Sequence, residues 1–224
     1  MRIEALIFDM DGLLVDTEHL AYSAMEAFLA KHTLHRRQEI HDQMLGRRLP
    51  EAIAIVREGY GLVHSLDDLI ADYTVMRRDT LIGNVKPMPG AFEAVRFGLD
   101  AGLKVGLASS GLRDQVALSL DEAGLAGMFA VEVTGDDVER GKPSPDLFLK
   151  AAEGLGVEPA ACVVFEDAPA GIAAAVNAGM RAVAVPNEHS ARMEFAVTPE
   201  ATLTSLRDAI SWLKTQGVGG RGGS

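Results

Sequence analysis

Five short apolar segments rich in β-branched residues recur along the chain. They cover residues 3–8, 103–108, 129–134, 161–165 and 181–185. Segments that are apolar on both faces are typical of strands in a parallel sheet covered by helices. Stretches with helical spacing lie between the last four, at residues 114–123, 145–155 and 169–178. This alternation predicts a doubly wound α/β fold.

Proline and glycine mark the ends of the predicted helices. Ser144 and Pro145 suit the N-cap and the first helical position of one helix, and Pro169 suits the first position of the next. Gly124 and Gly179 fall where a residue in the left-handed conformation commonly ends a helix. These start and stop residues therefore support the alternation of strands and helices.

The stretch between the first two predicted strands, residues 9–102, is much longer than the ~12 or more residues that a crossover between parallel strands needs. Its apolar positions follow helical spacing. One face has Leu20, Ala24, Ala27 and Phe28, a second has Ile53 and Val56, and a third has Leu66, Leu69, Ile70, Tyr73 and Met76 behind a capping-box pair, Ser65 and Asp68. We expect a helical cap at residues 17–86, a core made of residues 1–16 and 87–216, and a loose glycine-rich tail at residues 217–224.

Composition and charge exclude several classes of function. Lys and Arg total 21 against 32 Asp and Glu, so the net charge of −11 argues against nucleic acid or an anionic membrane as a partner. No apolar run approaches the ~18 residues of a membrane span, and the N-terminal run is too short for a signal peptide. The single cysteine, Cys162, lies in an apolar run, which favours a buried strand thiol over a nucleophile and a reducing, cytoplasmic location. The oligomeric state is not readable from the sequence, and a monomer is compatible with it.

Polar side chains follow the predicted strands at the points where the strands end. They are Asp9 and Asp11 after the first strand, Ser109 and Ser110 after the second, Lys142 in the loop after the third, and Glu166 and Asp167 after the fourth. The carboxyl ends of parallel strands meet at one edge of a sheet, where ligands bind. We therefore expect carboxylates, hydroxyls and an ammonium group to converge there.

The carboxylates in this set predict a metal site. Asp9 and Asp11 are two residues apart, so both can face one pocket, and Gly12 allows the chain to turn sharply. Together with Asp167 they form a cluster that would repel itself without a cation. Oxygen ligands with room for water and a phosphate oxygen suit Mg²⁺, and the same ion would draw in a phosphate.

The same residues suit phosphoryl transfer. Asp9 is the better nucleophile, and Asp11 could protonate the leaving oxygen and then activate water. Ser109, Ser110 and Lys142 are candidates to bind the phosphate. Each feature alone has an ordinary explanation: an Asp-X-Asp pair is often a turn or a fragment of a calcium loop, a serine at a strand end often bonds the backbone, and a lone lysine is usually solvated. The joint placement favours catalysis.

Four segments of the chain resemble, in order, the motifs of the haloacid dehalogenase-like hydrolase superfamily. They read F-D-M-D-G-L-L-V-D-T-E, L-A-S-S-G, G-K-P-S-P-D and F-E-D-A-P-A-G-I-A-A-A-V-N-A-G-M, and the resemblance spans residues 5–185. It implies a Rossmann-like doubly wound parallel sheet core with an inserted α-helical cap. It also implies Mg²⁺ dependence and phosphoryl transfer through an aspartyl phosphate.

The resemblance assigns roles to individual residues. Asp9 matches the nucleophile, and Asp11 matches the acid/base, which would also contact the metal through its backbone carbonyl. Ser109 matches the phosphate-binding hydroxyl and Lys142 the lysine that balances charge. The metal positions are matched by Asp167 and, as in the subgroup resembling β-phosphoglucomutase, by Glu166.

Within that subgroup the sequence favours a phosphatase over a mutase. Dehalogenase members lack the second aspartate and the metal, so Asp11 and Asp167 indicate phosphate chemistry. Mutases carry a histidine four positions after the threonine that Thr17 matches, but Ala21 stands there, and Leu112-Arg113 replaces an expected Lys-Asn pair. The expected substrate is a sugar phosphate or a similar phosphomonoester. A phosphosugar mutase and a pseudoenzyme that only binds a phosphorylated ligand remain alternatives.

Three predicted cap residues have no settled role in the sequence. Arg47 and Arg48 could bind the part of the substrate beyond the phosphate or simply be solvated, and we favour substrate binding. His19 lies near the first motif but out of register with the mutase histidine, so it is a substrate contact or an ordinary polar residue. A phosphoryl-accepting receiver domain does not fit, because its acceptor aspartate follows a later strand and it has no cap.

Overall fold

A parallel sheet lies at the centre of the structure, a computed structural model that describes residues 2–44 and 47–219. Its six strands within those residues have the order β3-β2-β1-β4-β5-β6. They are β1 (Ala5–Phe8), β2 (Lys104–Ala108), β3 (Val131–Val133), β4 (Cys162–Glu166), β5 (Arg181–Ala184) and β6 (Ala201–Thr202). Every pairing is parallel, so the predicted α/β class and doubly wound sheet are confirmed. The apolar segments of the sequence predict all of these strands except β6.

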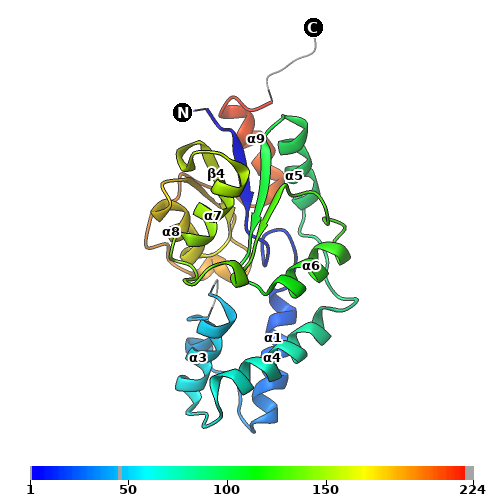
Figure 1. Cartoon of the computed structure of the whole chain (residues 1–224), viewed down its shortest axis with the longest axis vertical. Helices are drawn as coiled ribbons and strands as arrows, with labels where there is room; N and C mark the ends of the chain where they lie inside the picture. The colour runs from blue at the N-terminus through cyan, green and yellow to red at the C-terminus, as the bar shows by residue number, and fades with distance from the viewer. Residues whose placement is uncertain (1, 45–46, 220–224) are drawn as a thin grey trace.

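Helices cover both faces of the sheet, as Figure 1 shows. Alternate residues of β1 point to opposite faces: Leu6 and Phe8 join one apolar cluster, and Ala5 and Ile7 join the other. The first cluster includes residues of α5 (Ala91–Asp100), α6 (Arg113–Glu122) and α9 (Leu206–Thr215). The second includes α7 (Asp146–Leu155) and α8 (Pro169–Asn177). Short 3₁₀ turns at Gly135–Asp137, Pro159–Ala161 and Ser190–Arg192 complete the core.

Most of the predicted helix boundaries are confirmed. Pro169 begins α8, and Gly124 and Gly179 adopt φ values of 70° and 73° beyond the ends of α6 and α8. The predicted N-cap Ser144 is wrong, because α7 begins at Asp146 after Pro145. The Ser144 hydroxyl instead donates a hydrogen bond to the Asp146 carboxylate at 2.8 Å.

Among the described residues, the four helices between β1 and α5 lie beyond one end of the sheet (Figure 1). They are α1 (Glu18–Lys31), α2 (Gln38–His41), α3 (Leu49–Tyr60) and α4 (Leu66–Leu81). They share a separate apolar cluster that includes Phe28, Ile53 and Leu69. Ala27 is exposed, contrary to the expected face, because Met25 and Leu29 are the residues of α1 that turn inward beside Ala24 and Phe28. At the start of α4 the Ser65 hydroxyl accepts from the backbone N–H of Asp68 at 3.1 Å.

The chain leaves β1 through a tight turn that the returning chain braces. The Asp16 N–H donates to the Lys86 carbonyl, and the Met88 N–H donates to the Leu14 carbonyl, both at 2.8 Å. Gly12 has a φ of +78°, a backbone angle that residues with a Cβ rarely adopt. The turn after β1 is thereby fixed at the edge of the sheet where the acidic residues lie.

The C-terminal segment and Cys162 test two further expectations. A loose tail is predicted from residue 217, but Val218 is buried in the cluster that includes α9, so packing continues at least to this residue. Residues 220–224 lie outside the described residues.

Cys162 is fully buried in β4, and burial raises the pKa of its thiol to about 11, as expected for an inert strand thiol. None of the described helices is both long enough and apolar enough to cross a membrane.

Candidate active site

A buried ammonium group lies between two carboxylates at the centre of the site. Asp9 follows β1 directly and Glu166 ends β4, which is the neighbouring strand of the sheet. The Nζ of Lys142, from the loop before α7, donates to Asp9 Oδ1 at 2.5 Å and to Glu166 Oε1 at 2.7 Å. Lys142 is only 1% exposed. The strand ends therefore converge as the sequence predicts, and they do so away from solvent.

Three carboxylates lie close enough together to hold one cation. Asp9, Glu166 and Asp167 each offer an oxygen, and these oxygens lie within 4.8 Å of one another. The second oxygen of Glu166 accepts from the N–H of Ala168 at 2.6 Å, at the start of α8. Gly171 makes this position possible, because a Cβ there would lie 1.7 Å from Glu166 Oε1. The first turn of α8 is thus shaped around the glutamate.

The electrostatics of this cluster fit a divalent cation. Burial raises the pKa of Asp9 to about 8. The positive charge of Lys142 opposes this rise, and the negative charge of Glu166 adds to it. Burial, followed by the charges of Glu166 and Asp9, also raises the pKa of Asp167. Burial alone would lower the pKa of Lys142, but the two carboxylates outweigh it, so the pKa rises and the lysine stays charged. One ammonium does not balance three carboxylates, and an all-oxygen donor set suits Mg²⁺.

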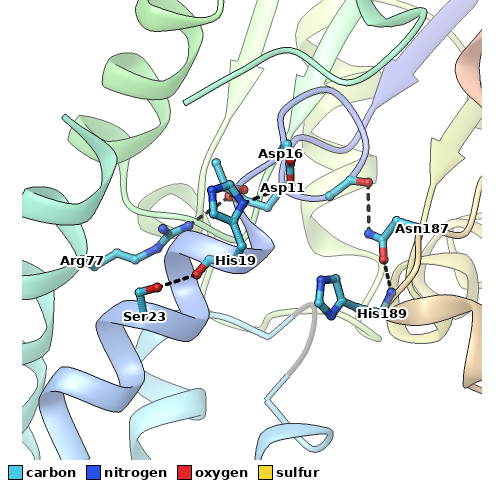
Figure 2. A network of polar contacts seen from close by, with 9 residues as sticks. Asp11, Asp16, His19, Ser23, Arg77, Asn187 and His189 are labelled. Atoms are coloured by element: carbon cyan, nitrogen blue, oxygen red, sulfur yellow. Dashed lines mark hydrogen bonds and ion pairs between the residues drawn. The ribbon is translucent and has the colours of Figure 1, made fainter. Parts of the chain in front are cut away.

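Asp11 lies beside this cluster, and its carboxylate has partners on three segments. Oδ1 accepts from the Thr17 hydroxyl at 2.5 Å and from the Arg77 guanidinium at 3.4 Å. Oδ2 accepts from the Ser109 hydroxyl at 3.5 Å, and Ser109 itself accepts from the N–H of Gly111 at 3.1 Å. Figure 2 shows Arg77 reaching Asp11 across α1 from α4. The carboxylate of Asp11 is therefore held in place from both the sheet edge and the helices.

A cavity of ≈ 180 Å³ opens between the sheet edge and the helices. Asp9, Asp11, Ser110, Glu166 and Asp167 line its floor. Its other walls include residues of α1, α3, α4 and α6, among them Met25, Ala52, Tyr73, Arg77 and Gln115. Five of the seven predicted core residues therefore line one cavity, and the other two, Lys142 and Ser109, are hydrogen-bonded to Asp9 and Asp11 in its lining.

The two predicted arginines differ in their contacts. Arg47 lines the cavity and is exposed, and its Nε donates to the Gln43 carbonyl at 2.7 Å. Arg48 instead donates to the carbonyls of Gly135 and Glu139, at 2.9 Å and 2.5 Å. The Arg48 side chain therefore connects the start of α3 to the loop that precedes Lys142. His19 lies 3.3 Å from Asp16 and is half exposed (Figure 2).

Four residues near the site were not predicted from the sequence. Thr17 and Glu18 belong to the first motif, so their position after Asp11 offered a signal. Burial raises the pKa of Glu18 to about 7, with the charge of Asp11 adding to the shift and that of Arg77 opposing it. Arg77 carried no local signal, whereas Asn187 lies two residues after the fifth predicted strand, where the rule of strand ends applies as well. Asn187 donates to Asp167 Oδ2 at 2.8 Å.

Comparison with known proteins gives consistent matches. A family model described as haloacid dehalogenase-like hydrolase matches residues 6–185. The phosphorylated carbohydrates phosphatase of Thermotoga maritima is 31% identical over 216 residues, which cover 93% of this chain and all of that protein. The crystal structure of CbbY from Rhodobacter sphaeroides in complex with phosphate is 26% identical, with a TM-score of 0.80 over 92% of this chain and 96% of that one. A β-phosphoglucomutase structure from Clostridium difficile, 22% identical, shares the fold with a TM-score of 0.84 over 96% of both chains.

Proposed function

Because the chain belongs to the haloacid dehalogenase-like hydrolase family and is a phosphoric monoester hydrolase, we propose that it hydrolyses a small phosphorylated metabolite through a phosphorylated Asp9. The observation that carries the proposal is the buried ammonium of Lys142 between Asp9 and Glu166, with Asp167 completing an acidic cluster. Such a cluster can accept a cation and, through it, a phosphate. The substrate class we favour is a sugar phosphate or a similar phosphomonoester.

Asp9, Glu166 and Asp167 would hold Mg²⁺, together with the backbone carbonyl of Asp11 that the family resemblance implies. When bound, the ion supplies positive charge that keeps Asp9 ionised and neutralises a phosphoryl oxygen. Lys142 lies against Asp9 and would balance the charge of the phosphoryl group once Asp9 carries it. Ser109 and Ser110 would donate hydrogen bonds to the phosphoryl oxygens.

In the first step an oxygen of Asp9 attacks phosphorus. A bond forms between that oxygen and phosphorus, and the bond from phosphorus to the leaving oxygen breaks. Asp11 begins this step protonated and gives its proton to the leaving oxygen, so the alcohol departs neutral. Thr17 and Arg77 hold the Asp11 carboxyl in the position from which it acts.

In the second step water attacks the phosphorylated Asp9. The Asp11 carboxylate takes a proton from the water as the new oxygen–phosphorus bond forms. The bond between phosphorus and the Asp9 oxygen breaks, which releases inorganic phosphate and restores the free carboxylate. Asp11 is then protonated and ready for the next substrate.

We further propose that residues 17–86 act as a cap that selects the substrate, with Arg47 as a candidate contact to its non-phosphate part. The name of the Thermotoga relative supports a phosphorylated carbohydrate. Two observations favour hydrolysis over mutase chemistry. Ala21 lines the cavity where mutases carry the histidine, and Arg113 is bonded to Asp137 on the surface.

Intact-mass spectrometry after brief mixing with acetyl phosphate and an acid quench tests the two aspartates separately. Asp11→Asn keeps the nucleophile but cannot activate water, so we expect it to accumulate one phosphoryl group. Asp9→Asn lacks the attacking oxygen and should carry none. An adduct on Asp9→Asn, mapped to Asp11 or Ser109, would overturn the mechanism.

Turnover of p-nitrophenyl phosphate tests the metal. We expect activity to disappear with a chelator and to return with excess Mg²⁺, and full activity in excess chelator would contradict the metal assignment. The same protein should release inorganic phosphate from a simple sugar phosphate without a bisphosphate activator. Efficient isomerisation of β-glucose 1-phosphate with little free phosphate would favour the mutase.

A further inference from the structure

Asn187 joins three segments of the active-site edge through one amide group. It follows β5, and its Nδ2 donates to Asp167 Oδ2 at 2.8 Å and to the Gly12 carbonyl at 3.1 Å. Its Oδ1 accepts from the backbone N–H groups of His189 and Ser190, at 2.8 Å and 3.0 Å. Figure 2 shows the Asn187 side chain pointing toward the loop that follows β1, with His189 beside it. One side chain thus connects β4, β5 and the turn that follows β1.

The orientation of this amide is determined by its neighbours. Two N–H donors face one end, so that end is the oxygen, and two acceptors face the other end, so that end is the NH₂ group. The fit is tight as well. A Cβ on Gly12 would lie 2.5 Å from Asn187 Nδ2 and 3.0 Å from Asp167 Oδ2. The amide can therefore occupy this position only because residue 12 is a glycine.

We propose that Asn187 is a positioning residue that orients Asp167 for the divalent cation and sets how tightly the site binds it. The inference rests on the proposed function, in which Asp167 holds the metal. A carboxylate that is already fixed loses less freedom when it binds an ion, and hydrogen bonds to metal ligands commonly raise metal affinity for this reason. The second donor, to Gly12, also fixes the turn after Asp9 and Asp11 against Asp167.

An amide is the side chain that suits this position. Aspartate could accept from the turn N–H groups but would place another negative charge 2.8 Å from Asp167 Oδ2. Leucine has a similar size but could neither donate to Asp167 nor accept from the turn. Asparagine does both without adding charge to a cluster that is already acidic.

Replacement of Asn187 by serine separates its two roles. The serine hydroxyl can still accept from the N–H groups of the turn, but it is too short to reach Asp167. We expect isothermal titration calorimetry on the metal-free protein to show Mg²⁺ binding weakened by about 10- to 100-fold. The metal-free variant should still unfold cooperatively in urea, at a somewhat lower midpoint because two hydrogen bonds are lost, and its KM at saturating Mg²⁺ should stay close to the wild-type value.

His189→Ala is the matched control, because only the backbone N–H of His189 contacts the Asn187 side chain and its own side chain is exposed. This variant should bind Mg²⁺ as the wild type does. Asn187→Thr, which keeps a hydroxyl for the turn, replaces the serine variant if the latter does not fold, and the same loss is expected. If a folded Asn187 variant binds Mg²⁺ as tightly as the wild type, the role of Asn187 is refuted and the metal assignment of the proposed function stands. Absence of Mg²⁺ binding in the wild type would overturn the metal assignment of the proposed function and the inference with it.

Discussion

Replacement of Lys142 by methionine tests the buried charges at the centre of the site. The two side chains have similar lengths, so the packing against neighbouring residues changes little. The ammonium that donates to Asp9 and Glu166 is lost, and both carboxylates remain buried. We therefore expect a stability cost that arises mainly from unpaired charge, together with a collapse of turnover.

The size of the effect follows from burial. Removal of one partner of a buried ion pair costs ~3–5 kcal/mol, because the other partner stays out of water without compensation. For a chain of 224 residues each kcal/mol lowers the melting temperature by ~2–4 °C, so the expected loss is roughly 6–20 °C. Arg113→Ala is the matched control. Its guanidinium pairs with Asp137 and is 55% exposed, and such a surface pair contributes ~0–1 kcal/mol.

Urea unfolding in the presence of a chelator measures the difference. Trp212, the single tryptophan of the chain, lies on α9 with its ring edge-on to Phe165 of β4, so its fluorescence reports on the packed core. Lys142→Met should unfold at a clearly lower urea concentration than Arg113→Ala, and it should also lose far more turnover. Equal losses in the two variants would refute the view that Lys142 is the buried counter-ion of the site.

Three further predictions concern Gly171, Cys162 and Arg48. Gly171→Ala should raise the Mg²⁺ concentration for half-maximal activity by about 10-fold or more, because its Cβ would displace the Glu166 carboxylate; an unchanged Mg²⁺ requirement would argue against that carboxylate as a ligand. The Cys162 thiol should react with Ellman's reagent only when the protein unfolds, and rapid labelling of the folded protein would contradict its burial. Arg48→Ala should lower the free energy of unfolding by ~1–2 kcal/mol through loss of its two bonds to the loop before α7, while Arg47→Ala should change it by less than ~0.5 kcal/mol. Equal changes in urea denaturation would show that the Arg48 bonds contribute little.

Much of the fold was predictable because parallel strands have a strong local signature. Strands buried on both faces appear as uninterrupted apolar runs, and β1, β2, β4 and β5 were found on that basis. The strand β6 has only two residues, Ala201 and Thr202, which is too short for any periodic pattern. The helix α9 did carry a signal, since Leu206, Ala209 and Leu213 are spaced for one helical face behind a capping serine.

The sequence located the carboxylates and Lys142 for a topological reason. Parallel strands all end at the same edge, so residues that follow different strands must meet there even when they are far apart along the chain. No such rule places the helices between β1 and α5. The direction in which Arg48 points depends on how α3 docks beside the loop before α7, and its spacing from Arg47 reveals nothing about that docking.

The contacts of Arg77 and Asn187 also join residues that lie far apart along the chain. Arg77 reaches Asp11 from a helix 66 residues later in the chain, and Asn187 reaches Gly12 across 175 residues. Arg77 follows no strand, and an arginine on a helix is usually solvated. Asn187 comes two residues after the predicted strand at residues 181–185, so the rule of strand ends reaches it, although an asparagine in a loop is also usually solvated. What distinguishes them is that each donates to a carboxylate of the strand edge. The predicted acidic cluster itself gives the reason to look for them, because buried carboxylates need donors beyond the one lysine in the motifs. For the donor on the helices, a sequence search would have had to choose among several arginines, and only the docking of α4 beside the sheet edge makes that choice.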